Sequence, residues 1–411
     1  MNKDTQVELL DFAGEPESSR RYFGWRVVAV LFVVAVLSWG FGFYGHAVYL
    51  AELRKLHGWS TSLIATASTI YYLVSAVLMI FVNDAIGRLG ARNCILSGAM
   101  CFAVAILGLS QAAQIWQLFA AYLVMALGWA FMTVGAITNI LGQWFDRKRG
   151  LAISLALNGA SFGGVLVVPA MIAAISAYGF SRAMLVSALV IIALAMPLAI
   201  FVLGKPAPKS PLFPLAQNGA ASQAWTRAST LRSAAFWVIS VSFSVGLLSQ
   251  AGVLVHQVAF LETSIGREGA AIAVALTTAT SICGRLAMGT WVDRINLRIF
   301  TTISFGSQAL ALLAMTQTTS FWPLLLLCAI YGLSVGNVIT LPSLIVQREF
   351  PAAAFGMIVA LSTAITQFVY AFGPGLVGIV RDASVNYAPA LVLCALFNLA
   401  AAGLIFWRPK L

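Results

Sequence analysis

Three ionisable side chains stand inside otherwise apolar stretches of the sequence, and they are His46, His256 and Arg285. Ionisable groups are costly within a membrane, so by default they mark function. Arg285 lies eight residues before Asp293, which at about 1.5 Å per helical residue places it roughly 12 Å inward from the end of its apolar run. A guanidinium held there can bind a carboxylate through two parallel hydrogen bonds. The competing interpretation is an arginine whose side chain extends to the cytoplasmic surface.

The two histidines and a set of neutral polar residues are the other candidates for substrate contact. A histidine can line a pathway, donate to an anion or titrate near neutral pH, although it can equally bond a backbone carbonyl between helices. The neutral candidates share helical faces within apolar runs, and they are Tyr72, Asn139, Tyr331, Gln367 and Tyr370. Hydrogen bonding between helices is the competing explanation for each of them.

Membrane-spanning helices are the elements that must position these residues. Of the 411 residues, 61% are hydrophobic and only 9% are charged, whereas a soluble chain carries about 25% charged residues. This composition excludes an ordinary soluble enzyme, a nucleic-acid-binding protein and a disordered chain. The five cysteines show neither CxxC pairs nor metal-ligand spacing, and no run resembles a phosphate-binding GxxxxGK[ST] loop. We therefore expect no disulfide framework, no metal and no cofactor.

Apolar runs long enough to cross a membrane occur twelve times, since a spanning helix needs about 20 mostly apolar residues. They cover residues 27–50, 61–82, 93–112, 116–140, 150–174, 182–203, 236–260, 268–290, 299–317, 321–345, 354–379 and 388–407. Their period is helical and differs from the ~10-residue alternating strands of a membrane barrel. The sequence therefore predicts an all-α membrane protein with twelve transmembrane helices.

The basic residues predict the orientation of these helices. With a cytoplasmic N-terminus, 18 of the 24 Lys and Arg residues fall in cytoplasmic segments and 5 in outer loops. This distribution fits the positive-inside rule with both termini in the cytoplasm. Residues 1–26 carry five acidic residues and no apolar core, so we expect a cytoplasmic tail and not a cleaved signal peptide.

A proline-containing polar linker over 204–232 separates six predicted spans in 27–203 from six in 233–411. The two halves resemble each other at a slowly drifting offset, with His46 and His256 210 residues apart. Two six-helix repeats are a transporter architecture in which the substrate site lies between the halves at the membrane midplane.

The loops after the second and eighth spans resemble the major facilitator superfamily. Its pattern after the second span is approximately G-x-x-x-D-R-x-G-R-[RK], and Asp84, Gly87 and Arg88 match it in register. Asp293 and Arg294 match its second copy after the eighth span. The resemblance implies a gating role for Asp84, Arg88, Asp293 and Arg294, through charge-assisted hydrogen bonds that latch the halves in one state. Anchoring of the topology by basic loops is the alternative.

The loop after the fourth span resembles that of one group of members within this superfamily. It reads Trp144-Phe145-Asp146-Arg147-Lys148-Arg149-Gly150-Leu151-Ala152, similar to the W-F-x-x-[KR]-R-G-x-A stretch of monocarboxylate-porter-like and oxalate/formate-exchanger-like members. The resemblance implies the major facilitator fold of two six-helix bundles. It also implies a carboxylate-binding arginine in the eighth span, at the stretch that contains Arg285. Related dicarboxylate exchangers add a lysine in the eleventh span, but residues 355–380 contain no Lys or Arg.

We therefore expect a secondary transporter that moves a small organic anion, a monocarboxylate, by alternating access. It is expected to act as a monomer in the lipid bilayer of a bacterial inner membrane, with protons or a counter-anion as coupling partner. The alternative is an efflux carrier of a neutral or amphipathic compound, which the aromatic content of 11% and the lack of intramembrane acids favour. An enzyme is not expected, since for example no H-E-x-x-H metalloprotease string is present, and neither is a nucleic-acid partner.

Overall fold

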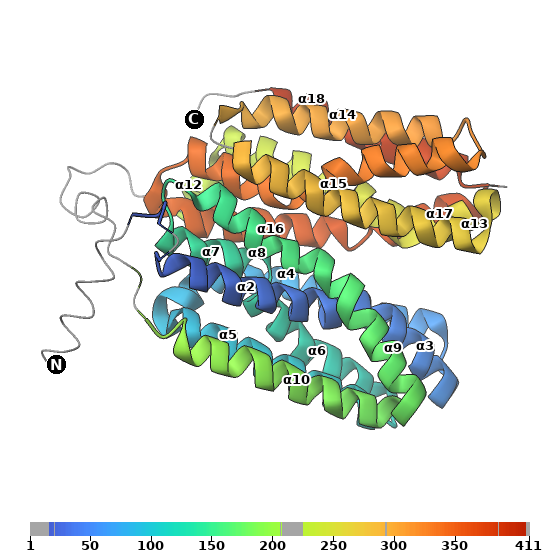
Figure 1. Ribbon diagram of the computed structural model, residues 1–411, viewed down its shortest axis with the longest axis horizontal. Coiled ribbons are helices and arrows are strands. Elements are labelled where there is room, and N and C mark those ends of the chain that lie inside the picture. Colours follow the sequence, from blue (N-terminus) through green and yellow to red (C-terminus); the bar gives the residue numbers. More distant parts are fainter. Residues whose placement is uncertain are drawn as a thin grey trace, which may run out of the picture. The chain divides into compact units, whose positions relative to one another are not determined.

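The computed structural model describes residues 16–19, 21–205, 207, 225–291, 294–384 and 386–407. Asp293, one of the predicted gating residues, lies outside the described residues. Within them every regular element is a helix, which confirms the all-α prediction. Figure 1 shows the helices coloured along the chain.

The contacts divide the chain into two compact units, each described here by itself. The first comprises residues 1–224 together with Pro351–Ala360, and the second comprises Trp225–Phe350 together with Leu361–Leu411. The short segment Pro351–Ala360 therefore packs with the N-terminal unit, although by chain position it belongs to the predicted C-terminal half.

The first unit contains the blue to green helices of Figure 1. Among its described residues, three spans are interrupted. Two of the interruptions are single π-helical turns, η1 and η2, which contact each other, and such turns are frequent at functional sites. The elements in order are α2 (Gly24–Trp39), η1 (Gly40–Tyr44), α3 (Gly45–His57), α4 (Thr61–Met79), α5 (Val82–Gln111), α6 (Ile115–Met132), α7 (Val134–Trp144), α8 (Arg149–Phe162), η2 (Gly163–Val167), α9 (Val168–Tyr178) and α10 (Phe180–Phe201).

The remaining elements follow the linker. A continuous run of helical hydrogen bonding, α13, holds two spans that meet at Gly266, where φ is +72°. The elements are α12 (Arg227–Arg232), α13 (Ala234–Trp291), α14 (Leu297–Met315), α15 (Phe321–Glu349), η4 (Ala352–Ala354), α16 (Phe355–Tyr370), α17 (Gly373–Asp382) and α18 (Ala388–Phe406). Of these, η4 and the first turns of α16 belong to the first unit.

The helices match the twelve predicted runs. Among the described residues, eleven helices or helix chains are long and apolar enough to cross a membrane, and Thr66–Met79 within α4 is a shorter apolar helix. Large apolar side chains such as Phe201, Leu310 and Trp322 are exposed, as expected where helices face lipid and not water. The helices thus pair their backbone N–H and C=O groups internally and present an apolar exterior, as a membrane requires.

Candidate functional site

Arg285 lies on the second span of α13 and is only 1% exposed. Its Nε donates a hydrogen bond of 2.9 Å to the carbonyl oxygen of Gly336 on α15. The structure therefore buries this guanidinium within the second unit, whereas a snorkelling side chain would be exposed. Burial of a cation inside a span is costly, and by default it marks a functional position.

Glycines at the interface of α13 and α15 make the hydrogen bond between Arg285 and Gly336 possible. A Cβ atom at Gly284 would lie 2.0 Å from the carbonyl oxygen of Leu333, and one at Gly336 would lie 2.2 Å from that of Ser281. Larger residues would push the two helices apart. The glycines thus bring the backbone of α15 within hydrogen-bonding range of Arg285, and this bond fixes the direction of the guanidinium plane.

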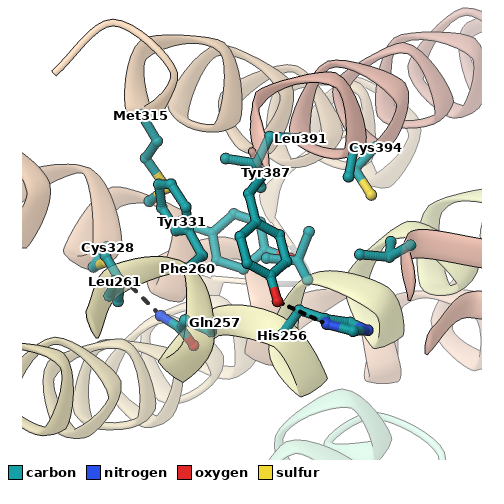
Figure 2. A pocket seen from close by; sticks show the side chains of 13 residues that line it. His256, Gln257, Phe260, Leu261, Met315, Cys328, Tyr331, Tyr387, Leu391 and Cys394 are labelled. Atoms are coloured by element: carbon teal, nitrogen blue, oxygen red, sulfur yellow. Dashed lines mark hydrogen bonds between the residues drawn. The ribbon is translucent and has the colours of Figure 1, made fainter. Parts of the chain in front are cut away.

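His256 lies in the first span of α13, and both of its ring nitrogens have partners in the second unit. Nδ1 is 3.4 Å from the hydroxyl oxygen of Tyr387, and Nε2 is 3.1 Å from the carbonyl oxygen of Pro374. Figure 2 shows the imidazole and the Tyr387 hydroxyl pointing toward each other. His256 is therefore held by neighbouring helices of its own unit.

A small cavity lies beside this histidine (Figure 2). It has room for about one water molecule, which is far less than a drug-sized ligand needs. Tyr331 of α15 is fully buried at its wall, and its hydroxyl has no hydrogen-bond partner. The lining residues are Val253, His256, Gln257, Phe260, Leu261, Met315, Cys328, Tyr331, Val377, Tyr387, Ala390, Leu391 and Cys394. The structure thus brings His256 and Tyr331 to one cavity, as an internal space of the second unit.

The last two predicted contacts of the second unit lie on α16. Gln367 and Tyr370 are both half-buried, and the side-chain nitrogen of Gln367 is buried without a hydrogen-bond partner. They fall in the last turn of α16, directly before the break that separates it from α17.

His46 lies in the first unit, in a cluster of aromatic rings. Its Nδ1 is 3.3 Å from the Tyr122 hydroxyl, and the two rings stack with centroids 5.2 Å apart. Tyr71 and Tyr72 contact the imidazole edge-on at 4.8 and 5.5 Å, and Nε2 is buried without a partner. The structure therefore brings together the predicted residues His46 and Tyr72. Trp129, whose ring centroid is 6.3 Å from that of Tyr72, extends the cluster.

Tyr122 was absent from the predicted site, although the sequence contained a signal for it. Tyr122 and Tyr331 are 209 residues apart, close to the offset of 210 that relates His46 to His256. The repeat could therefore have identified Tyr122 as a neighbour of His46.

A second group of contacts lies at the cytoplasmic end of the first unit, by the predicted orientation. Asn139 of α7 donates to the side-chain oxygen of Asn83 at 2.6 Å, and Gln143 donates to Asn139 at 3.2 Å. A Cβ atom at Gly356 of α16 would lie 2.2 Å from Asn83 Oδ1 and 2.3 Å from Asn139 Nδ2. Asn139 thus contacts the start of α16, a partner that sequence spacing did not reveal.

Arg149 adds a cation to the same group. Its guanidinium lies 4.8 Å from the ring centre of Phe355, and it donates to the carbonyl oxygens of Phe145 and Gly142 at 2.7 and 3.0 Å and to Asp146 at 3.1 Å. We call the set Asn83, Asn139, Arg149, Phe355 and Gly356 the clasp. It joins the predicted loop after the fourth span to the start of α16.

Of the predicted gating residues, Asp84 and Arg88 belong to the first unit and Arg294 to the second. Asp84 lies in the first turn of α5 and is half-buried, and Arg88 on the same helix is exposed. Arg294, the next described residue after α13, is also exposed. A buried ion pair of the second unit is Arg298–Glu349, with Nε to Oε1 at 2.6 Å and Nη2 to Oε2 at 2.7 Å. Neither residue of this pair was predicted.

The N-terminal tail contacts the loop after the fourth span. The two carboxylate oxygens of Glu17 accept from the backbone N–H groups of Asp146 and Lys148 at 2.8 and 2.7 Å. Tyr22 donates its hydroxyl to the carbonyl oxygen of Trp144. Burial, together with the charges of Glu17 and Asp146, raises the pKa of Tyr22 to about 12. The tail therefore holds the loop that leads into α8.

Two G-x-S-x-G strings, at residues 159–163 and 332–336, test the enzyme alternative. Both lie within helical elements, and Ser334 donates to the carbonyl oxygen of Tyr331, 2.9 Å away. A serine nucleophile in such a motif sits on a sharp strand-to-helix turn. These glycines therefore serve helix packing and give no support to a hydrolase.

Comparison with known proteins agrees with this architecture. The mouse protein named monocarboxylate transporter 11 is 26% identical to this chain over 97% of the chain and 89% of its own length. A Bacillus subtilis protein named as an uncharacterized MFS-type transporter, YcxA, is 23% identical over 82% of the chain and 83% of its own length. The crystal structure of the E. coli fucose:proton symporter superposes with a TM-score of 0.71 at 14% identity, covering 94% of this chain and 98% of that one; at this identity the likeness shows the fold alone. Residues 30–374 match the family model of the Major Facilitator Superfamily, and this membrane protein therefore belongs to that superfamily of transporters.

Proposed function

We propose that this transporter carries a small monocarboxylate and that Arg285 binds the carboxylate group. The observation that supports this most directly is the complete burial of Arg285 inside a span, with its Nε bonded to Gly336. A guanidinium presents several N–H donors in one plane, which matches the two oxygens of a carboxylate. Relatives named monocarboxylate transporters support the same substrate class.

A single carboxylate is the substrate that best fits this cationic site. No Lys or Arg occurs in residues 355–380, so a second cation for a dicarboxylate would have to come from another segment. We propose that transport proceeds by alternating access in a bacterial inner membrane, with Asp84, Arg88, Asp293 and Arg294 in gating. We assign Asn139 to the clasp, because its amide already contacts Asn83 and the backbone position of Gly356.

The remaining predicted contacts divide by unit. In the first unit, His46 and Tyr72 offer a partly exposed aromatic surface, behind which the imidazole Nε2 is buried without a hydrogen-bond partner. In the second unit, Tyr331, Gln367 and Tyr370 are proposed to line the substrate pathway beyond Arg285. Gln367 fits this role because its side-chain nitrogen has no partner.

The aromatic cluster around His46 also favours a second candidate, an efflux carrier of amphipathic cations. Aromatic faces attract cations by about 0.5–2 kcal/mol, and four rings surround this histidine. Arg285 argues against this candidate, because a buried cation repels a cationic substrate.

Ligand-induced stabilisation of the purified protein distinguishes the two candidates. A true ligand raises the melting temperature by mass action. We expect stabilisation by small monocarboxylates such as lactate, pyruvate or benzoate, weaker stabilisation by the matched dicarboxylates, and none by the corresponding amides. Stabilisation by amphipathic cations alone would overturn the proposal and select the efflux carrier.

A further inference from the structure

The eleventh span is broken beside His256. α16 ends at Tyr370 and α17 begins at Gly373. Pro374 has no backbone N–H, so it cannot make the helical hydrogen bond back to position 370. The break is pressed against α13, since a Cβ atom at Gly373 would lie 2.3 Å from the carbonyl oxygen of Leu248. α17 is therefore a separate helical piece whose position depends on its contacts with α13 and α18.

His256 joins these three helices through both of its ring nitrogens. A backbone carbonyl can only accept a hydrogen bond, so the contact of 3.1 Å with Pro374 requires the proton on Nε2. Nδ1 is then the acceptor, and the hydroxyl of Tyr387 donates to it across 3.4 Å. The tautomer follows from the partners. In its neutral form the imidazole thus connects α13 to Pro374 of α17 and to Tyr387, the N-cap residue of α18.

We propose that His256 is the proton-binding residue of the transport cycle, and that protonation releases the joint between α13, α17 and α18. This rests on the proposed transport function. The incoming proton takes the lone pair of Nδ1, which then can only donate. The Tyr387 hydroxyl loses its acceptor and must rotate or move away. Protonation therefore breaks one of the two bonds that hold α17 and α18 to α13.

The groups around His256 determine whether its protonation favours the closed or the open joint between α13, α17 and α18. Among the described residues, no Asp, Glu, Lys or Arg lines the cavity beside the ring, and its titratable groups are the neutral side chains of Cys328, Tyr331, Tyr387 and Cys394. The charged group that contacts this network is Arg381 of α17, 5.7 Å from the ring centre of Tyr387, and its partner Asp382 lies 3.5 Å from it. A positive imidazolium therefore has no carboxylate beside it in this cavity, and it loses the hydrogen bond from Tyr387. The joint with the Tyr387 hydrogen bond formed therefore favours the neutral ring of His256. Proton uptake favours the joint in which this bond is broken.

Direct observation of the histidines tests the tautomer without any substrate. The chain contains three histidines, so isotope-labelled histidine in the protein in nanodiscs should give signals that single replacements can assign. We expect the His256 signal at high pH to show the Nε2–H form and to change when the ring is protonated as the pH is lowered. Backbone hydrogen exchange of residues 373–382 should be faster in the protonated form. An Nδ1–H form at high pH, or a His256 signal that does not change on acidification, would overturn the proposal.

Two variants connect the titration to transport. In proteoliposomes, His256→Gln should remove the pH dependence of carboxylate flux, while the repeat-related control His46→Gln keeps it. Tyr387→Phe removes the donor that competes for Nδ1, so both the NMR midpoint and the flux midpoint should move to higher pH. Unchanged pH dependence in His256→Gln, or an unchanged midpoint in Tyr387→Phe, would contradict the proposal. If no monocarboxylate is carried while the NMR and exchange results hold, the proposed substrate is wrong and the proton site stands.

Discussion

Gly356 of α16 lies directly against Asn139 of α7: a Cβ atom at Gly356 would be 2.3 Å from Nδ2 of that asparagine. The same Cβ atom would be 2.2 Å from Oδ1 of Asn83, the acceptor of the Asn139 hydrogen bond. The start of the eleventh span therefore fits the first unit only because this position carries no side chain. Disrupting this contact tests whether the clasp takes part in gating.

Gly356→Val should weaken the clasp, because the new side chain displaces the hydrogen-bonded amides of Asn83 and Asn139. We expect slower carboxylate transport and faster backbone hydrogen exchange in residues 351–360, with carboxylate affinity nearly unchanged. Gly375→Val in α17 is the matched control, since nothing lies within 4 Å of a Cβ atom there. Equal transport rates and exchange in the two variants would show that the clasp has no gating role.

Arg285→Lys should reduce carboxylate binding at least tenfold, a loss of ~1.4 kcal/mol or more. Lysine keeps the charge but lacks the planar fork that matches a carboxylate. The measurement is carboxylate affinity of the purified variant by calorimetry. Arg298→Lys is the control, because Arg298 is also a buried arginine of the second unit, 6% exposed, and forms an ion pair with Glu349. We propose no substrate contact for it. Wild-type affinity in Arg285→Lys would assign Arg285 to structure and leave the anion proposal without its main residue.

Glu349→Gln should destabilise the second unit by up to ~3 kcal/mol, because it leaves the buried Arg298 without its carboxylate. Arg298 also donates to the carbonyl oxygen of Ile405 at 2.9 Å, at the end of α18, so the loss should extend to that helix. Denaturant unfolding in detergent measures the change. The double variant Arg298→Met/Glu349→Leu should recover part of the stability. A Glu349→Gln protein as stable as the wild type would show that the pair contributes nothing.

Because of Tyr22, the free energy of unfolding should decrease at alkaline pH. Its pKa is raised from 10.0 to about 12 in the folded protein, so the folded state keeps the phenol proton more tightly than the unfolded state. The stabilisation is complete below pH 10 and is lost as the pH rises from 10 to about 12. Melting temperatures across this range should fall more steeply for the wild type than for Tyr22→Phe. Parallel curves would indicate that the Tyr22–Trp144 contact is not formed.

Local composition was enough to predict where the apolar helices lie and to single out Arg285 as an ionisable residue within one of them, whereas its burial was decided by the packing of α13 against α15. An apolar run of sufficient length must form a helix in lipid, since its backbone has no other hydrogen-bond partners there. A charged residue within such a run is costly wherever it points. Both arguments use only neighbouring residues, which explains why α13 and α15 appear at the expected positions around Arg285.

Partners from distant parts of the chain were decided by packing. His46 and His256 have matching positions in the two repeats, yet His46 contacts Tyr122 and His256 contacts Tyr387, which is 131 residues away. The packing of Pro351–Ala360 with the first unit likewise depends on whether one glycine fits between two asparagines. Hydrogen bonds and van der Waals contacts change over a few tenths of an ångström. Spacing along the sequence carries no information at that scale, and only the assembled helices determine which side chains meet.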